Sequence, residues 1–148
     1  MVHALEEIHR LLRPNGILID IHPFPQAPEV KVIQGDEVIF AEPKRDIQDE
    51  DEDVKQADRA LAEVVERGLF DVEHSEEFDF FSYASSVPEL RDFWEKYNAY
   101  DDTLKAEARL AQEEDVYTRA EQIRRELGDA EAAIHEKTKI ARLKPKLV

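Results

Sequence analysis

The apolar residues of this chain follow two periods, that of a helix and that of a strand. Leu5, Ile8 and Leu12 recur at helical spacing, and the segment from Pro14 to Gly16 then turns the chain. The same helical period predicts helices over residues 54–65, 86–111 and 116–127. The sequence Ser86-Val87-Pro88-Glu89 is a capping box with a proline in the first turn, so a helix is expected to begin there.

The strand period predicts a sheet between and after these helices. The β-branched run Ile17–His22 is dense enough for an interior strand with both faces covered. Residues 30–33 and 38–40 are short apolar runs joined by a Gly-Asp turn, which predicts a hairpin. Residues 69–83 read as one or two strands, and residues 134–143 as a closing strand.

Together these elements predict an α/β fold, on the borderline with α+β. We expect a partial Rossmann-like mixed sheet of about four to five strands with one hairpin, flanked by helices. The 148 residues suit a single domain, residues 1–148.

The charge of the chain is strongly negative and unevenly placed. The formal net charge is -15, which repels nucleic acid and anionic membrane surfaces, so we expect neither as a partner. Residues 44–53 form an acidic connecting segment, which suits a solvated helix start, or alternatively a divalent-ion site, although it lacks the spaced ligands of a calcium loop. Residues 137–148 contain five basic residues and no acid, and are expected to form a basic carboxyl-terminal tail.

The composition also limits the chemistry and the location. The sequence contains no cysteine, which excludes disulfides, thiolate zinc sites and a cysteine nucleophile. No run approaches the ~20 apolar residues of a membrane span. A cytoplasmic location is therefore expected, and no residues are assigned as metal ligands.

One motif resembles a known family. The amphipathic helix ending in Leu12-Arg13-Pro14-Asn15-Gly16 and followed by an aliphatic strand is similar to a stretch of the class I S-adenosylmethionine-dependent methyltransferases. There, the helix before the fifth strand typically ends in "LKPGG". The resemblance covers residues 4–23. Beyond them, the order of elements is loosely like the last third of that fold, where a helix and an antiparallel strand pair complete the sheet.

The resemblance implies that this chain holds only the carboxyl-terminal half of the fold. The family binds its cofactor through a glycine-rich turn, but the four glycines of this sequence lie far apart. The family's cofactor site would therefore precede Met1. We expect no cofactor for this chain alone, no catalysis by it alone, and S-adenosylmethionine only if a partner chain or upstream sequence completes it. An open sheet edge would favour a homodimer or a complementing chain.

Four side chains are candidates for a substrate pocket in such a completed protein. Asp20 and His22 share a face at the carboxyl end of their strand, where open α/β sheets bind ligands. Alternatively, His22 caps the strand end and binds water or backbone. Phe80 and Tyr83 belong to an aromatic cluster that could line a pocket, although such a cluster more often forms core. No catalytic or cofactor-binding residue is assigned.

A different class of function remains open. The chain could be an acidic α+β module for protein interaction or assembly, with no enzymatic role. Its helix–turn–strand motif would then echo the methyltransferase family by convergence.

Overall fold

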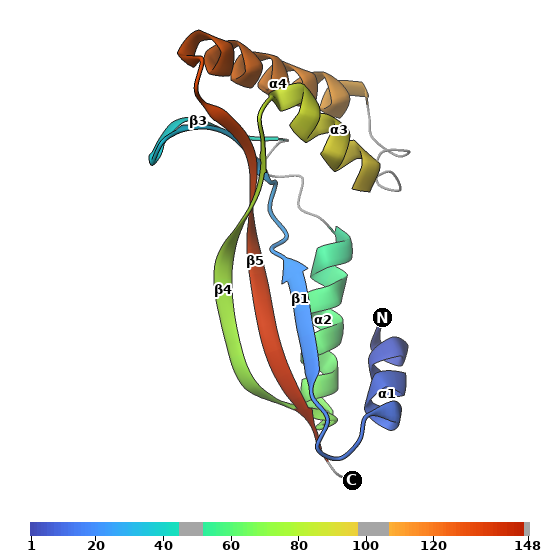
Figure 1. Cartoon of the computed structure of the whole chain (residues 1–148). Coiled ribbons are helices and arrows are strands. Elements are labelled where there is room, and N and C mark those ends of the chain that lie inside the picture. Colours follow the sequence, from blue (N-terminus) through green and yellow to red (C-terminus); the bar gives the residue numbers. More distant parts are fainter. Residues whose placement is uncertain (45–51, 98–106, 147–148) are drawn as a thin grey trace. The chain divides into compact units, whose positions relative to one another are not determined.

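A computed structural model describes residues 1–44, 52–97 and 107–146 of the chain. The helices and strands, in chain order, are α1 (Val2–Leu11), β1 (Leu18–Pro23), β2 (Glu29–Gln34), β3 (Glu37–Pro43), α2 (Glu52–Glu66), β4 (Phe70–Ala84), α3 (Val87–Tyr97), α4 (Glu107–Leu127) and β5 (Glu131–Pro145). The predicted α/β architecture, a sheet with a hairpin flanked by helices, is confirmed (Figure 1).

Strand β5 organises the sheet. Its second half pairs with β1 and its first half with β2, both antiparallel, and β2 pairs with β3. Strand β4 also pairs with β5. The ion-pair contacts Asp71–Lys146 and Glu73–Lys144 run in opposite directions along these two strands, so this pair is antiparallel as well. Every strand pair in the described residues is therefore antiparallel, which replaces the expected mixed sheet.

The chain, predicted as one domain, divides into two compact units. Unit 1 comprises residues 1–26, 50–79 and 137–148, and unit 2 comprises residues 27–49 and 80–136. Strands β4 and β5 each contribute residues to both units.

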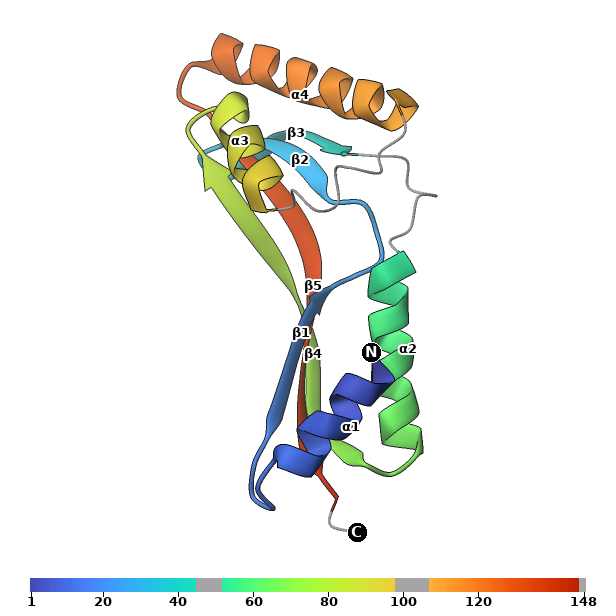
Figure 2. The same ribbon diagram turned by 90° about the vertical axis from the view of Figure 1, so that its right-hand side faces the viewer.

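Unit 1 packs its two helices against one face of its strands. Figure 1 and Figure 2 show α1 and α2 next to each other, beside β1. The core contains the buried residues Leu61, Val64, Phe70, Ala141 and Leu143, with Leu5 and Leu12 of the predicted helical stripe packed against it. The predicted stripes therefore face this core in part, because Ile8 of the first stripe is 36% exposed.

The β1 strand corrects one expectation. Predicted as an interior strand with both faces covered, it pairs with β5 alone among the described residues. Leu18 lies opposite Leu143 on the core face, whereas Ile19 and Ile21 on the other face are 45% and 59% exposed. A β-branched run therefore indicated a strand, but it did not show how many faces of that strand are covered.

Unit 2 is built around the β2–β3 hairpin. Its predicted Gly-Asp turn is confirmed, and Gly35 has a φ of 58°, a conformation that glycine adopts without steric cost. One half of the predicted capping box forms, because the Glu89 amide donates to Ser86 Oγ over 3.3 Å. The Glu89 carboxylate accepts hydrogen bonds from the amide and the hydroxyl of Ser85, the residue before the cap. The buried core joins all the elements of the unit and contains Val30, Val32, Val87, Leu90, Val116, Tyr117, Ala120, Ala130, Ala132 and Ile134.

Two further expectations change. The predicted basic tail, residues 137–148, is strand β5 as far as Pro145, because its basic residues alternate with apolar ones that enter the core. Arg142 on this strand forms an ion pair with Glu73 on β4, over 3.1 Å. Of the acidic segment 44–53, Lys44 lies just after β3 and α2 begins at Glu52, while residues 45–51, and with them most of the alternative ion site, lie outside the described residues.

Candidate functional site

The two strand residues predicted as pocket candidates do meet. His22 Nδ1 lies 2.6 Å from Asp20 Oδ2, and His22 Nε2 lies 3.0 Å from Asp58 Oδ1 on helix α2. Lys139 of β5 lies opposite His22 in the register, and its Nζ is 3.4 Å from the same Asp58 oxygen. The side chain of His22 is only 11% exposed. This arrangement links β1, α2 and β5 within unit 1.

These contacts decide what His22 can do. Each ring nitrogen faces a carboxylate oxygen, so neither nitrogen is open to a substrate while both contacts hold. The ring therefore acts as a polar connection between β1 and α2. The expected alternative of water or backbone partners for His22 is also replaced, because its partners are two carboxylates.

A small cavity adjoins this cluster. It has a volume of about 90 Å³ and is lined by His22, Pro23, Phe24, Asp58, Glu77 and Lys139. Such a volume accommodates water or a very small polar group rather than a metabolite. Any substrate chemistry here would need further walls from outside the described residues.

The two aromatic candidates lie elsewhere. Phe80 and Tyr83 belong to the part of β4 that is in unit 2, and they are 48% and 57% exposed. They do not form the expected core. Their neighbour Phe81 makes the ring contacts of this region. Its ring stacks on that of His135 at a centroid distance of 4.6 Å and on that of Tyr83 at 5.7 Å. The described residues do not bring the four candidates into one site.

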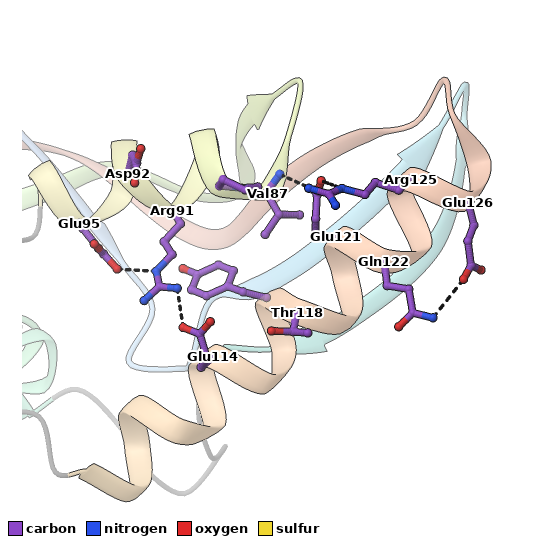
Figure 3. Close-up of a pocket in the computed structure, with 12 residues that line it drawn as sticks. Val87, Arg91, Asp92, Glu95, Glu114, Thr118, Glu121, Gln122, Arg125 and Glu126 are labelled. Carbon is purple, nitrogen blue, oxygen red and sulfur yellow. Dashed lines mark hydrogen bonds and ion pairs between the residues drawn. The ribbon is translucent and has the colours of Figure 1, made fainter.

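A larger site, which the sequence analysis did not predict, lies in unit 2. Helices α3 and α4 border a groove of about 680 Å³ (Figure 3). Its lining comprises Val87, Pro88, Arg91, Asp92, Glu95, Glu114, Tyr117, Thr118, Glu121, Gln122, Arg125 and Glu126. The carboxylates therefore outnumber the guanidinium groups five to two.

Arg91 connects the two walls of this groove. Its Nε donates to Glu95 over 2.7 Å on its own helix, and its Nη1 donates to Glu114 on α4 (Figure 3). The guanidinium also lies over the Tyr117 ring, 5.6 Å from the centroid. The groove thus places one cation between two carboxylates and above an aromatic ring.

Glu121 connects the two helices at the other end of the groove. It accepts hydrogen bonds from Arg124 Nε over 2.9 Å, from Arg125 Nε over 2.7 Å and from the Val87 amide over 3.0 Å. The hydrogen bond from Arg124, with those from the Val87 amide and Arg125, lowers the pKa of Glu121 to about 2 against the opposing effect of burial. Glu121 is therefore a structural anion that holds the start of α3 onto α4.

Part of this site has a sequence signal. Arg91 with Glu95 and Glu121 with Arg125 are pairs at i,i+4 spacing, which marks polar helix faces. The approach of Asp58 to His22, or of Arg91 to Glu114, has no local signal, because it depends on how elements distant in sequence pack.

The described residues contain neither a metal-binding group nor a helix that could span a membrane. No group of three or more histidine and carboxylate side chains among them is arranged to hold a metal ion. None of the described helices combines the length and apolar character needed to cross a membrane.

No family model, curated protein or solved structure was found to match this chain.

Proposed function

We propose that this chain is the carboxyl-terminal part of a methyltransferase-like fold, is not catalytic alone, and acts in the cytoplasm once residues outside this sequence complete an S-adenosylmethionine site. The completing residues would come from a partner chain or from sequence upstream. The order of elements in unit 1 carries this proposal: helix α1, strand β1, helix α2, and then the antiparallel pair of β4 and β5. This is the order that the resemblance implies.

The close packing around Gly16, in the turn between α1 and β1, supports the proposal. A Cβ atom on residue 16 would lie 3.0 Å from the Arg13 carbonyl oxygen and 3.0 Å from Leu12 Cδ2. Contacts this close are tighter than most Cβ atoms make, so the turn favours glycine there. The glycine of the "LKPGG"-like motif therefore has a steric reason, which favours a shared backbone conformation over a chance match of letters.

The unpaired edge of β1 supports the proposal that residues outside this sequence complete the sheet. Along one edge β1 pairs with β5, and no other described strand pairs with it. Ile17, Ile19 and Ile21 form an aliphatic row on its outer face, with 45–59% of each side chain exposed. An unpaired edge beside exposed aliphatic residues is a favourable place for an added strand. A complementing chain or a second copy would satisfy both features there.

The glycines and His22 support the lack of catalysis by this chain alone. Gly35 lies in the hairpin turn, Gly68 and Gly128 follow α2 and α4 with positive φ, and Gly16 is in the α1–β1 turn. All four glycines thus serve turns between elements. His22, the best-placed side chain for proton transfer, is held by two carboxylates.

Calorimetric titration tests the proposal. The chain as given should show no heat of S-adenosylmethionine binding. The same chain extended by the polypeptide that its upstream genomic sequence encodes should bind with micromolar affinity. That upstream sequence should also encode a glycine-rich strand–turn–helix. Micromolar binding by the chain alone, or an upstream sequence without that motif together with no binding partner that supplies it, would overturn the proposal.

A second candidate function has its own supporting observation. The groove of unit 2, with its excess of carboxylates, favours an acidic interaction module without enzymatic role. The two candidates are distinguished by the extended chain. Binding of a partner at the groove, with no S-adenosylmethionine binding by any form of the protein, would favour the second.

A further inference from the structure

The floor of the groove between α3 and α4 is apolar and fixed. Val87 and Tyr117 are 2% and 5% exposed and belong to the core of unit 2. Pro88 and Thr118 lie beside them in the lining, and Thr118 is exposed near the middle of the groove (Figure 3). A ligand in this groove would therefore contact Pro88 and Thr118, above the buried Val87 and Tyr117, and polar side chains at both walls.

The walls favour positive charge. Asp92, Glu95, Glu114 and Glu126 are all exposed carboxylates in the lining. Glu95 and Glu114 share the single cation of Arg91, whereas Glu121 is paired with two arginines. The guanidinium of Arg91, bound between two of these carboxylates over Tyr117, shows the kind of group that the groove accommodates. Guanidinium and ammonium groups are attracted both by carboxylates and by the faces of aromatic rings.

The shape of the groove favours an elongated ligand. Its walls are an 11-residue helix and a 21-residue helix, and 21 helical residues span about 32 Å. A third helix laid along two others contacts them through residues at i, i+3, i+4 and i+7, with its remaining faces in solvent. Small metabolites are usually enclosed on most sides, which an open groove between two helices does not provide.

We propose that this groove binds a basic amphipathic helix of a partner protein. Apolar side chains of that helix would lie on Pro88 and Thr118, above the buried Val87 and Tyr117, and its lysines or arginines would face Glu95, Glu114 and Glu126. Charge complementarity selects the occupant: the chain has a formal net charge of -15, so a second copy would be repelled where a basic partner is attracted. The inference concerns unit 2 alone and does not rest on the proposed function.

Fluorescence anisotropy with a designed probe tests this inference. The probe is a fluorescein-labelled peptide of about 16 residues, long enough for roughly four helical turns, with leucine at i, i+3, i+4 and i+7 and lysine elsewhere. A peptide with glutamate in place of each lysine is the charge control. The full chain should bind the lysine peptide and not the glutamate peptide, and binding should weaken as salt is raised.

A matched pair of variants separates the groove from general attraction to an acidic protein. Thr118→Arg places bulk and a positive charge in the groove, whereas Gln112→Arg makes the same charge change on an exposed position of α4 outside the lining. Thr118→Arg should weaken binding of the lysine peptide by roughly tenfold or more. Gln112→Arg should change it by less than about twofold.

Three outcomes would overturn the inference. One is equal weakening by both variants, which would mean nonspecific attraction, and another is the absence of binding by the unmodified chain at low salt. The third is a dimer, seen by sedimentation without peptide, that Thr118→Arg dissociates and Gln112→Arg does not, since this would assign the groove to a second copy. Circular dichroism of both variants checks that α4 remains helical.

Discussion

Unit 1 and unit 2 expose different kinds of surface. Unit 1 partly buries its charged cluster, with His22 held between Asp20 and Asp58, but exposes an aliphatic row along the free edge of β1. Unit 2 closes its apolar core and exposes a groove whose walls carry an excess of carboxylates. The contrast teaches that the two units expose surfaces of different chemistry, one aliphatic and one acidic.

The dependence of association on salt concentration distinguishes these two surfaces. Apolar burial and backbone pairing at β1 depend weakly on ionic strength, whereas attraction of a basic partner to exposed carboxylates is screened by it. Variants that affect one unit and spare the other therefore break or sharpen the comparison.

The largest expected effect is a cavity in the core of unit 1. Phe70 is fully buried at the start of β4, and its ring meets that of His9 edge-on at a centroid distance of 5.3 Å. Phe70→Ala should cost about 3–5 kcal/mol of unfolding free energy. Hydrogen exchange should show the loss of protection chiefly in α1, α2 and β1. Equal loss in α3 and α4 would contradict the division into two units, and Phe70→Leu is the milder control.

The next effect concerns a buried ion pair in unit 2. Lys44 Nζ lies 3.6 Å from Glu113 Oε2, both side chains are less than 10% exposed, and the ammonium lies 5.2 Å from the centroid of the Trp94 ring. Lys44→Met should cost about 3 kcal/mol, because it leaves a buried carboxylate with less compensation. Trp94, the single tryptophan of the sequence, reports the unfolding of unit 2 by its fluorescence.

A second substitution shows whether the buried charge is responsible. Adding Glu113→Gln to Lys44→Met should recover part of the loss, since the uncompensated charge is then gone. Purely additive losses in the double variant would mean that packing of the Lys44 side chain, and not its charge, stabilises the unit.

These buried groups show where prediction from sequence succeeds and where it ends. Local patterns indicated the helices, the hairpin and the Ser86 cap, because each is set by neighbours within a few residues. The predicted helix over residues 86–111 was too long, since α3 ends at Tyr97 and α4 begins at Glu107. Periodicity did not reveal that Ile19 and Ile21 are exposed, since the face that a strand buries depends on which elements pack there. Asp20 and His22 were found together because they lie two residues apart on one strand, whereas Asp58 required the packing of α2.

A moderate effect is expected at the anchor of the groove. The pKa of Glu121 lies near 2, below its ordinary value of 4.5, so the stabilisation is complete above about pH 5 and is lost as pH falls toward 2. Glu121→Gln should therefore cost roughly 2 kcal/mol at neutral pH, and the difference from the unmodified chain should shrink on acidification. Denaturant titration from pH 7 to about pH 3, followed by Trp94 fluorescence, measures this.

Glu126→Gln is the matched control for that experiment. Glu126 accepts a hydrogen bond from Gln122 over 3.1 Å on the same helix and is exposed. Its replacement should change stability by less than about 0.5 kcal/mol at any pH. A loss as large as that of Glu121→Gln would mean that α4 is sensitive to any charge change, and the role given to Glu121 would fail.

The smallest effect on stability is expected on strand β1 of unit 1. A substitution there tests association without unfolding the chain. Ile21 is 59% exposed, so Ile21→Lys removes little buried area and should change the unfolding free energy by less than about 0.5 kcal/mol. A lysine on an edge strand nevertheless opposes the addition of another strand, because its charge would have to be buried. If β1 recruits a second copy or a completing chain, Ile21→Lys should abolish that association in sedimentation experiments while leaving peptide binding at the groove unchanged. An association that survives Ile21→Lys would show that it does not use the outer face of β1. A stability loss above about 2 kcal/mol would show that this face is covered within the chain itself, and either result would contradict the exposed aliphatic surface assigned to unit 1.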